Sequence, residues 1–592
     1  MPTAYTPRFT SLVAILKESV AKFGDKPAIG TRKAHGWEWT SFRQLGELVD
    51  QARAGIAALG VGPGDRVAVI SNNRMEWAIC AYACYTRGIA YVPMYEAQLD
   101  KERQYILNDS GAKLCFVAND GIEKRVRGMQ ADLPELQHVV NFEGQSFKAL
   151  LETGKANPVV PSVPNDGDVA SIIYTSGTTG NPKGVKLTHR NLAANVSALL
   201  EIAPIREGDR SLAFLPWAHV FGGTVELNVL IATGGQLAIC DNTDKLLGYL
   251  PEVKPTMLFA VPRIWNRIYD GVQKQVAGKP KVIQTIFHTA LGAKAKLRRN
   301  ESLSLGERIA LPVAEKLIFS KIVERFGGQL RFAFSGAAAL AREVAEFIDN
   351  LGIQVYEGYG MTESSGGTTG NVPGAARIGS VGKPIPGVEV RIVKDDKEVP
   401  VGEEGEIVIY GTGVMLGYHN LPDVTAEALR PDGGLRSGDL GRLDKDGFLY
   451  ITGRVKELYK LANGRYVAPA PLEEKLQLSP YILQAVVYGD NQPHNVALLV
   501  PDMTALKGWA ERQGIPADEK ALLTDARTHE LMRKEIDSCS RDFKGFESVV
   551  KFVLTPEELT PANNMLTPTL KLKRRNVLAK YEDQLKSLYT YS

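Results

Sequence analysis

A short loop rich in glycine and hydroxyl side chains places the strongest constraint on how this chain can fold. Residues 174–184 read YTSGTTGNPKG; they follow an apolar, strand-like run at 169–174 and precede a helix-like beginning at 188–192. Glycines let backbone N–H groups approach an anion, hydroxyls add donors, and a lysine adds positive charge. The loop therefore predicts a phosphate site built from Thr175, Ser176, Gly177, Thr178, Thr179 and Lys183.

Two other interpretations of this loop are weaker. A Walker-type loop of a kinase or GTPase needs Gly before its Lys and Ser or Thr after it, whereas Pro182 and Gly184 flank Lys183. A purely structural Gly/Ser/Thr turn is the remaining alternative, but the segment contains more hydrogen-bond donors than a turn needs.

Length and composition limit the class of protein. The chain has 592 residues, more than one hydrophobic core usually supports, and its net charge of +3 gives no indication of a nucleic-acid partner. Five scattered cysteines without paired spacing predict reduced thiols and a cytoplasmic location. We expect no export signal and no transmembrane segment, because no run of about 18 apolar residues occurs. Peripheral contact with the inner membrane surface stays open.

The pattern of apolar and polar residues changes along the chain. Residues 65–260 alternate β-branched runs, such as 66–70 and 90–94, with helical patterns such as 77–88, which predicts parallel α/β layers. Residues 379–418 contain short strands broken by Gly and Pro, as at 388–393 and 405–410, which favours a small antiparallel β subdomain. A boundary near 453–456 precedes an α+β tail of a size that can fold by itself.

The segment between residues 268 and 330 is rich in Lys, Arg and Ala with helical periodicity. Such a segment is most often a solvated helical face. The alternative is a helix that docks on a membrane surface or on a partner protein.

Two further loops carry groups that suit a nucleotide. In 356–363 (YEGYGMTE), Tyr359 could stack on a purine, Thr362 could bond a phosphate oxygen and Glu363 could hold Mg²⁺. A turn with a surface Glu is the alternative. In 436–454, Asp439 can accept two hydrogen bonds from ribose hydroxyls and Arg454 can pair with a phosphate, whereas Asp446-Gly447 fits a hairpin turn.

An aromatic loop and a basic tail complete the set of candidates. Residues 215–223 (LPWAHVFGG) suit an apolar pocket with His219 at its edge, although a lone His in apolar surroundings is more often simply packed. Residues 566–575 (LTPTLKLKRR) form a charge run that would ordinarily be a solvated face.

In this order, these segments closely resemble the adenylate-forming superfamily of acyl-CoA synthetases, luciferases and peptide-synthetase adenylation domains, from about residue 37 to residue 575. The segments 72–77 (NNRMEW), 261–267 (VPRIWNR) and 460–469 (KLANGRYVAP), with the long insert after 267, are similar to long-chain fatty-acyl-CoA synthetases. The resemblance implies an α/β fold in two domains. Residues 1–455 would form layered, mainly parallel sheets with helices and a small antiparallel β subdomain, and residues 456–592 a small mobile α+β lid.

The resemblance also implies an activity and a set of site residues. A medium- or long-chain fatty acid would attack the α-phosphate of ATP to give acyl-AMP and pyrophosphate, and coenzyme A would then displace AMP, with Mg²⁺ as cofactor. The implied catalytic residues are Lys571 (with Lys573 as second choice), Thr362, Glu363, Arg454 and His219; Glu363 would also bind the metal. The nucleotide would further contact Gly336, Ala337, Ala338, Glu357, Gly358, Tyr359, Gly360, Asp439 and Tyr450. The acyl pocket would comprise Trp217, His219, Val220, Phe221 and Gly222, and Lys456 would be the hinge.

Two rival functions stay open. The first is an acyl-AMP ligase that loads an acyl carrier protein, and the second is a non-catalytic protein that binds nucleotide or acyl chains. A homodimer also stays open, and the apolar pocket residues do not by themselves fix the chain length of the acid, because one methylene is worth only about 1 to 3 kcal/mol.

Overall fold

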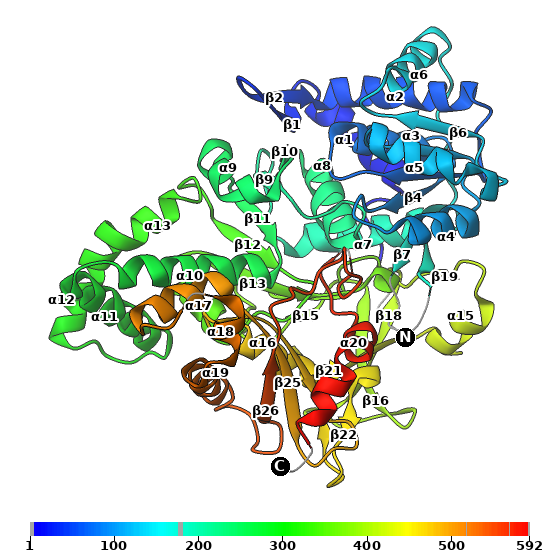
Figure 1. Ribbon diagram of the computed structural model, residues 1–592. Coiled ribbons are helices and arrows are strands. Elements are labelled where there is room, and N and C mark those ends of the chain that lie inside the picture. Colours follow the sequence, from blue (N-terminus) through cyan, green and yellow to red (C-terminus); the bar gives the residue numbers. More distant parts are fainter. Residues whose placement is uncertain (1–4, 176–180, 517, 568, 590–592) are drawn as a thin grey trace.

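A seven-stranded sheet forms the framework of the N-terminal part (Figure 1). The computed structural model describes residues 5–175, 181–516, 518–567 and 569–589. The strand order of this sheet is β19 (Gly417–Tyr418), β8 (Lys183–Thr188), β7 (Val169–Thr175), β4 (Ala90–Met94), β3 (Arg66–Ile70), β5 (Leu114–Val117) and β6 (His138–Asn141). Its central pairs are parallel. The predicted layered α/β architecture is confirmed, and its strands are apolar because helices cover both faces.

Strand β8 of this sheet was not predicted. The chain leaves β7, passes the glycine-rich loop and returns antiparallel as β8 before helix α7 (His189–Ile202) begins. The Thr188 hydroxyl caps that helix by accepting the Asn191 N–H at 3.1 Å, and Asn191 returns a bond to the Thr188 N–H. Strand β7 is therefore followed by an antiparallel strand rather than directly by a helix.

Two smaller sheets lie beside the first. One has the order β2 (Gly36–Ser41), β1 (Pro27–Lys33), β10 (Gln236–Ile239) and β9 (Arg210–Ala213). The other has the order β11 (Met257–Ala260), β12 (Phe332–Ser335), β13 (Gln354–Tyr359), β14 (Thr369–Gly370) and β15 (Lys383–Pro384). Because β11, β12 and β13 are parallel, their carboxyl ends meet at one edge. The loops at this edge are 336–340 and 360–366.

The predicted antiparallel β subdomain is present but is longer than residues 379–418. Its strands are β17 (Lys397–Glu398), β16 (Val388–Lys394), β18 (Gly405–Gly411), β20 (Leu435–Leu443) and β21 (Leu449–Arg454), in that order. Asp446 and Gly447 form the turn between β20 and β21, with Gly447 at φ 81°. The subdomain therefore extends up to the predicted hinge.

Helices surround the sheets of the N-terminal part. They are α1 (Leu12–Phe23), α2 (Phe42–Ala58), α3 (Met75–Tyr85), α4 (Asp100–Ser110), α5 (Asp120–Gly128), α6 (Gln145–Ala156), the π-helix η2 (Phe221–Asn228), α8 (Val229–Thr233), α9 (Leu246–Val253), α14 (Arg342–Asn350) and α15 (Pro422–Ala428). Helices α10 (Pro262–Ala277), α11 (Lys281–Arg298), α12 (Leu305–Ala314) and α13 (Ser320–Glu324) project to one side in Figure 1. None of the helices in the described part of the chain is both long and apolar enough to cross a membrane.

The C-terminal part has its own sheet and its own apolar clusters. Strands β24 (Ile482–Tyr488), β25 (Asn495–Pro501) and β26 (Val549–Leu554) form the sheet, packed with α16 (Pro469–Leu476), α17 (Met503–Arg512), α18 (Glu519–Thr524), α19 (Ala526–Cys539) and α20 (Arg574–Ser587). Its contacts with the N-terminal part include two ion pairs. Lys573 lies 3.1 Å from Glu102 of α4, and Lys475 pairs with Glu343 of α14. The division at residue 455/456 stays a prediction.

Candidate active site

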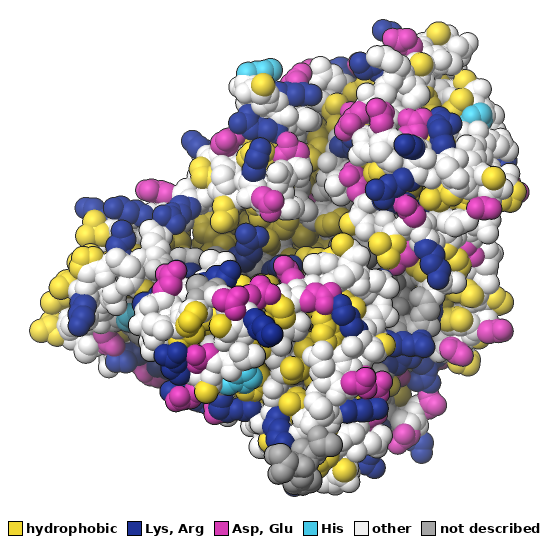
Figure 2. Space-filling model, viewed as in Figure 1, with side chains coloured by type: hydrophobic (Ala, Val, Ile, Leu, Met, Phe, Trp, Pro, Cys, Tyr) yellow, Lys and Arg dark blue, Asp and Glu magenta, His cyan; other side chains and the backbone are white. Residues whose placement is uncertain are grey.

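The larger of the two described cavities lies within the N-terminal part, among helix α7, the π-helix η2 and strands β11 to β14. The space inside it, open solvent included, is about 720 Å³. One end is apolar and is lined by Leu199, Ile202, Ile205, Val225 and Val229; the other is lined mainly by glycines, among them Gly336, Gly358, Gly360 and Gly366. Figure 2 shows a hollow with hydrophobic side chains on its floor, above helix α10.

A buried carboxylate organises the polar end of the cleft. Asp439 of β20 is 4% exposed, and it accepts a hydrogen bond of 2.7 Å from the Tyr359 hydroxyl of β13. Its other oxygen lies 2.8 Å from Nε of Arg454, the last residue of β21. Burial, together with the Asp439 charge, raises the pKa of Tyr359, so Tyr359 stays a neutral donor. Each Asp439 oxygen keeps a free lone pair that could accept a hydroxyl.

A second cluster forms around Glu363 on the loop after β13. Glu363 is 8% exposed and accepts a hydrogen bond of 2.9 Å from the Tyr418 hydroxyl of β19. The ammonium of Lys183, on β8, lies 5.1 Å from the centre of the Tyr418 ring. Because β19 pairs with β8, the short strand brings Tyr418 between the predicted phosphate-binding lysine and the predicted metal-binding carboxylate.

The loop after β12 receives one carboxyl group from each part of the molecule. The Glu357 side chain accepts the Leu340 N–H at 3.3 Å, and burial raises the pKa of Glu357 to about 7. Glu474 of helix α16 accepts the Ala339 N–H; burial and the nearby Glu473 and Glu357 raise its pKa to about 8. The C-terminal part therefore contacts the loop that contains Gly336, Ala337 and Ala338.

This loop also holds strained backbone and an unpaired donor. Ala337 has a φ of 71°, a conformation that residues other than glycine rarely adopt. The buried hydroxyl of Ser335 lines the cavity and has no hydrogen-bond partner in the described part of the chain. An orphaned polar group in a pocket suits a ligand that would satisfy it.

His219 is neutral in this environment. Burial, aided by the positive charge of Lys571, lowers the pKa of His219 to about 3. Its Nδ1 accepts the Phe221 N–H at 3.1 Å, so in the neutral ring Nε2 carries the proton. The imidazole can therefore donate from Nε2, and it lines the same cavity as Val220 and Phe221.

The C-terminal tail brings Lys571 into the cleft. The residue is exposed to water there, yet protein surrounds its ammonium closely enough for desolvation to lower the pKa of Lys571. Arg454 lowers that pKa further, whereas the charges of Asp439 and Glu363 act in the opposite direction. The backbone of Lys571 is fixed by two hydrogen bonds to Thr567, of 3.0 and 2.8 Å.

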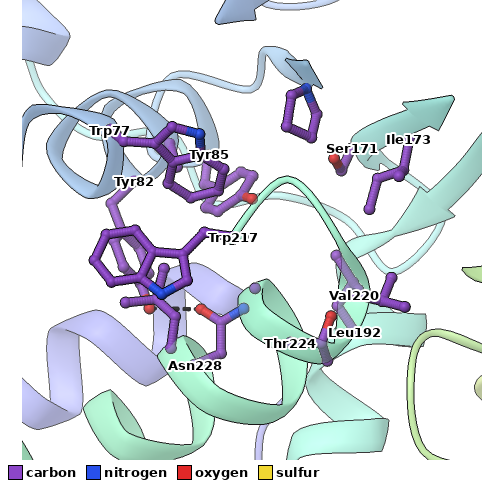
Figure 3. A pocket seen from close by; sticks show the side chains of 14 residues that line it. Trp77, Tyr82, Tyr85, Ser171, Ile173, Leu192, Trp217, Val220, Thr224 and Asn228 are labelled. Atoms are coloured by element: carbon purple, nitrogen blue, oxygen red, sulfur yellow. Dashed lines mark hydrogen bonds between the residues drawn. The ribbon is translucent and has the colours of Figure 1, made fainter. Parts of the chain in front are cut away.

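Trp217 and Gly222 do not line this cavity. Trp217 is 1% exposed and lines a second, aromatic cavity of about 400 Å³ on the other side of η2, with Trp77, Tyr82 and Tyr85 of α3 (Figure 3). In Figure 3 the Tyr82 hydroxyl bonds Asn228, at 2.6 Å. A Cβ on Gly222 would lie 2.3 Å from the Pro216 carbonyl oxygen, so this glycine permits a close backbone approach. Trp217 and Gly222 therefore hold the shape of the aromatic loop without lining the main cavity.

Other predicted residues take separate positions. Tyr450 lies outside the Asp439 cluster, because its hydroxyl bonds Asp444 near the β20–β21 turn. Thr175 ends β7, Thr362 is buried beside Glu363, and Lys456 is exposed in the turn η6 (Val455–Glu457). The remaining loop residues, Ser176, Gly177, Thr178 and Thr179, lie outside the described residues.

Sequence reasoning missed Tyr418, Ser335 and Glu474. Tyr418 follows a glycine in a segment that had no recognisable strand pattern, and its strand has only two residues. Ser335 was missed because it ends an apolar strand, where a serine gives no functional pattern. Glu474 was missed because a single Glu on a helix is usually a solvent-facing residue. The alternation of polar and apolar residues at 183–188 is the one pattern that could have predicted β8. The strand β19, which contains Tyr418, pairs with β8.

Comparisons with known proteins agree with this geometry. Residues 16–419 match the family described as AMP-binding enzyme, and residues 457–592 match the AMP-binding enzyme C-terminal domain. The chain is 34% identical over 571 residues to the long-chain-fatty-acid–CoA ligase FadD15 of Mycobacterium bovis (93% of this chain, 92% of the relative). It is 31% identical over 614 residues to long-chain-fatty-acid–CoA ligase 1 of Homo sapiens (98% and 87%).

A solved structure shares the fold. The adenylation domain of a carboxylate reductase from Mycobacterium chelonae aligns with a TM-score of 0.79 at 23% identity, covering 99% of this chain and 92% of that one. At this identity the likeness concerns the fold alone.

The close backbone contact at Gly360 generates a prediction. A Cβ at this position would lie 1.6 Å from the Gly366 carbonyl oxygen, so Gly360→Ala must displace the loop that carries Thr362 and Glu363. We expect a loss of stability of about 1 to 3 kcal/mol, the usual cost of overpacking, measured by denaturant unfolding, together with weaker nucleotide binding by calorimetry.

Gly370→Ala is the matched control, because Gly370 lines the same cavity and a Cβ there meets no atom within 4 Å. Equal stability and equal nucleotide affinity of the two variants would show that the contact does not constrain the loop.

Proposed function

This chain belongs to the AMP-binding enzyme family, and from that membership we propose that it activates long-chain fatty acids with ATP and transfers the acyl group to coenzyme A. The curated relatives that support this proposal are named as long-chain-fatty-acid–CoA ligases and align over nearly the full chain. ATP and coenzyme A are the substrates that the family implies. Medium-length chains belong to the same proposal.

One structural observation carries the proposal: a single cavity joins an apolar end to a glycine-lined polar end. A fatty acid in the apolar end would present its carboxylate to a nucleotide in the polar end. Glycines at the polar end leave room for a base and ribose close to the backbone. A protein that only bound acyl chains would have no need for Asp439, Arg454 and Lys571 next to residues that line the cavity.

The first step joins two anions. An oxygen of the fatty-acid carboxylate attacks the α-phosphorus of ATP, the bond to the β-phosphate oxygen breaks, and acyl-AMP and pyrophosphate form. Two unit negative charges about 4 Å apart repel by roughly 1 kcal/mol in water and about 4 kcal/mol at an effective dielectric of 20. Cations and donors fixed in advance offset this repulsion.

We assign the roles by position in the cleft. Lys571 would bridge the carboxylate and the α-phosphate, with Arg454 nearby, and Thr175 and Lys183 with their loop would hold the β- and γ-phosphates. Asp439 would hold the ribose while Tyr359 and the loop after β12 would frame the adenine. Neutral His219 would donate from Nε2 toward the carboxylate, at the point where Val220 and Phe221 begin the acyl pocket.

Glu363 fits a role in binding Mg²⁺. It is a buried carboxylate that Tyr418 orients through one oxygen, and it faces the cleft beside Lys183. Within the described ranges no group of three or more His, Cys, Asp or Glu side chains is placed to hold a metal ion. Glu363 would therefore hold Mg²⁺ jointly with phosphate oxygens of ATP, the arrangement usual for this ion, which supplies charge neutralisation there.

The second step requires a different arrangement of the lid. The thiol of coenzyme A attacks the acyl carbonyl carbon, the bond to the AMP oxygen breaks, and the thiol proton is released. Lys571 stands in the cleft that coenzyme A must enter, so one lid orientation cannot easily serve both steps. We propose Lys456 as the hinge, because it lies two residues after Arg454 in an exposed turn.

Location and assembly are further proposals. All five cysteines are free, four of them buried, which supports a reducing cytoplasmic environment. Peripheral contact with the inner membrane surface is proposed on separate grounds below, and a homodimer stays a prediction.

The experiment that tests the function measures two products. Pyrophosphate release that depends on fatty acid separates a ligase from a binding protein, and free acyl-CoA separates this proposal from loading of an acyl carrier protein. A panel of acids from acetate to C20, with cinnamates, tests the substrate class. The long-chain assignment is wrong if acetate or an aryl acid exceeds dodecanoate in kcat/KM.

We expect Lys571→Ala to reduce acyl-AMP formation by about a hundredfold or more, roughly 2.7 kcal/mol, because one fixed charge donor is lost. Pyrophosphate release in a single turnover measures the effect. Preformed acyl-AMP and coenzyme A should still react at a substantial rate.

Lys573 provides the control for that assignment. Its ammonium bonds Glu102 across the lid interface, so Lys573→Ala should reproduce the milder effect of Glu102→Gln, and the exchange Glu102→Lys with Lys573→Glu should restore activity. If Lys573→Ala loses acyl-AMP formation while Lys571→Ala forms acyl-AMP at the normal rate, the catalytic lysine is Lys573, two residues later than assigned.

Glu363→Gln should raise the Mg²⁺ concentration needed for half-maximal adenylation, because an amide oxygen is a poorer ligand for a hard dication than a carboxylate. Tyr418→Phe, which keeps the carboxylate but removes its hydrogen bond, should shift the titration less. An unchanged Mg²⁺ titration for Glu363→Gln would remove this residue from the metal site.

Lys456→Pro should preserve single-turnover pyrophosphate release while thioester formation collapses, because proline fixes its own φ and restricts the residue before it. Lys456→Ala should affect both steps far less. The hinge assignment is lost if the proline variant makes acyl-CoA at the normal rate, or if the alanine variant is equally damaged.

A further inference from the structure

Exposed hydrophobic side chains concentrate on the projecting helices α11, α12 and η4 (Glu315–Phe319). Of the 14 large hydrophobic side chains exposed in the described part of the chain, five lie between residues 282 and 317: Val282 (69%), Leu297 (47%), Leu305 (77%), Ile309 (61%) and Leu317 (54%). Leu305 and Ile309 are four residues apart on α12, so they share one face of the helix. We call these five residues with their basic neighbours the tip surface.

The positive charge of the whole chain is concentrated in the same segment. Residues 279–321 contain nine Lys or Arg and three Glu, a net charge of +6. The complete chain carries +3, from 70 basic and 67 acidic residues, so everything outside this segment carries −3. Figure 2 shows hydrophobic and basic side chains together at the left edge, over α11, α12 and α13.

The acidic residues of this segment are already neutralised. Glu307 lies 2.8 Å from Lys296, Glu315 lies 2.5 Å from Lys294, and Glu301 lies 2.6 Å from Arg299. The first pair joins α11 to α12, and the second joins α11 to η4. The basic side chains without an ion-pair partner among the described residues include Lys281, Arg308, Lys316 and Lys321, all of them exposed.

The shape of the tip favours a flat partner over a protein that fits a groove. The helices project from the sheets in Figure 1, and neither of the two described cavities lies among them. Hydrophobic side chains at the end of a projection, mixed with unpaired cations, match the interface of an anionic bilayer, where apolar groups enter the headgroup region and Lys and Arg meet lipid phosphates.

We propose that the tip surface docks the protein reversibly on an anionic lipid bilayer. Leu305 and Ile309 enter the headgroup region, and Arg308 and Lys316 contact the phosphates. This docking does not depend on the proposed ligase activity, although it would place the chain beside a bilayer, into which long-chain fatty acids partition.

The test measures co-sedimentation with phosphatidylcholine vesicles prepared with and without phosphatidylglycerol. The wild-type protein should bind the anionic vesicles, and binding should weaken as salt is raised. Leu305→Glu with Ile309→Glu should reduce the binding constant by about tenfold or more. Val160→Glu with Val163→Glu is the matched control, because these side chains are 83% and 88% exposed outside the tip surface.

A second pair of variants tests the charges. Arg308→Glu with Lys316→Glu should weaken binding to anionic vesicles, whereas Lys124→Glu with Lys155→Glu changes the net charge equally at exposed positions on α5 and α6 and should not. Unfolding temperature and pyrophosphate release with dissolved fatty acid should be unchanged in all four variants, which separates docking from folding and from the ligase function.

Three outcomes would overturn the proposal. One is equal vesicle binding by the tip variants and their controls, and another is equal binding of wild type to neutral and anionic vesicles. The third is a wild-type oligomer that the tip variants convert to monomer without change in vesicle binding, which would make the tip an interface between copies.

Discussion

The buried carboxylate of Asp439 is the interaction on which the rest of the site depends. It joins two sheets of the fold, because Asp439 and its partner Arg454 lie on neighbouring strands β20 and β21 of the antiparallel subdomain, whereas its other partner, Tyr359, ends the parallel strand β13. A buried carboxylate is costly unless it is paired and hydrogen-bonded, so its two partners must stay in place. This requirement fixes the distance between the parallel sheet and the antiparallel subdomain, and it sets the position from which the lid begins.

The C-terminal part has its own core and contacts the N-terminal part through several side chains. Its ion pairs with the N-terminal part, Lys573 with Glu102 and Lys475 with Glu343, are partly exposed to solvent. The apolar clusters of the C-terminal part, by contrast, lie within that part. A C-terminal part with its own core could rotate as a unit without unfolding, as the second step of the proposed reaction would require.

The apolar end and the glycine-lined end of the cavity depend on different physical interactions. The apolar end gains its specificity from burial, which is non-directional and discriminates weakly between chain lengths. The polar end relies on fixed donors and charges, whose geometry is set by strand ends and by glycines that permit close backbone approach. The π-helix η2 separates this cavity from the aromatic chamber around Trp217, so the same short segment shapes both.

The sequence by itself determined the classes of element and most chemical groups of the site. Local patterns predicted the apolar strands β3, β4 and β7. They also predicted the loops that contain Tyr359, Glu363 and Asp439, because periodicity and glycine spacing are local properties of a sequence. Only the tertiary structure decided that Tyr418 reaches Glu363, that Trp217 faces away from the main cavity and that Tyr450 bonds Asp444 instead of joining Asp439. These facts depend on pairings between segments far apart in the chain, and no local pattern encodes which face of a short strand or loop such a pairing turns toward the site.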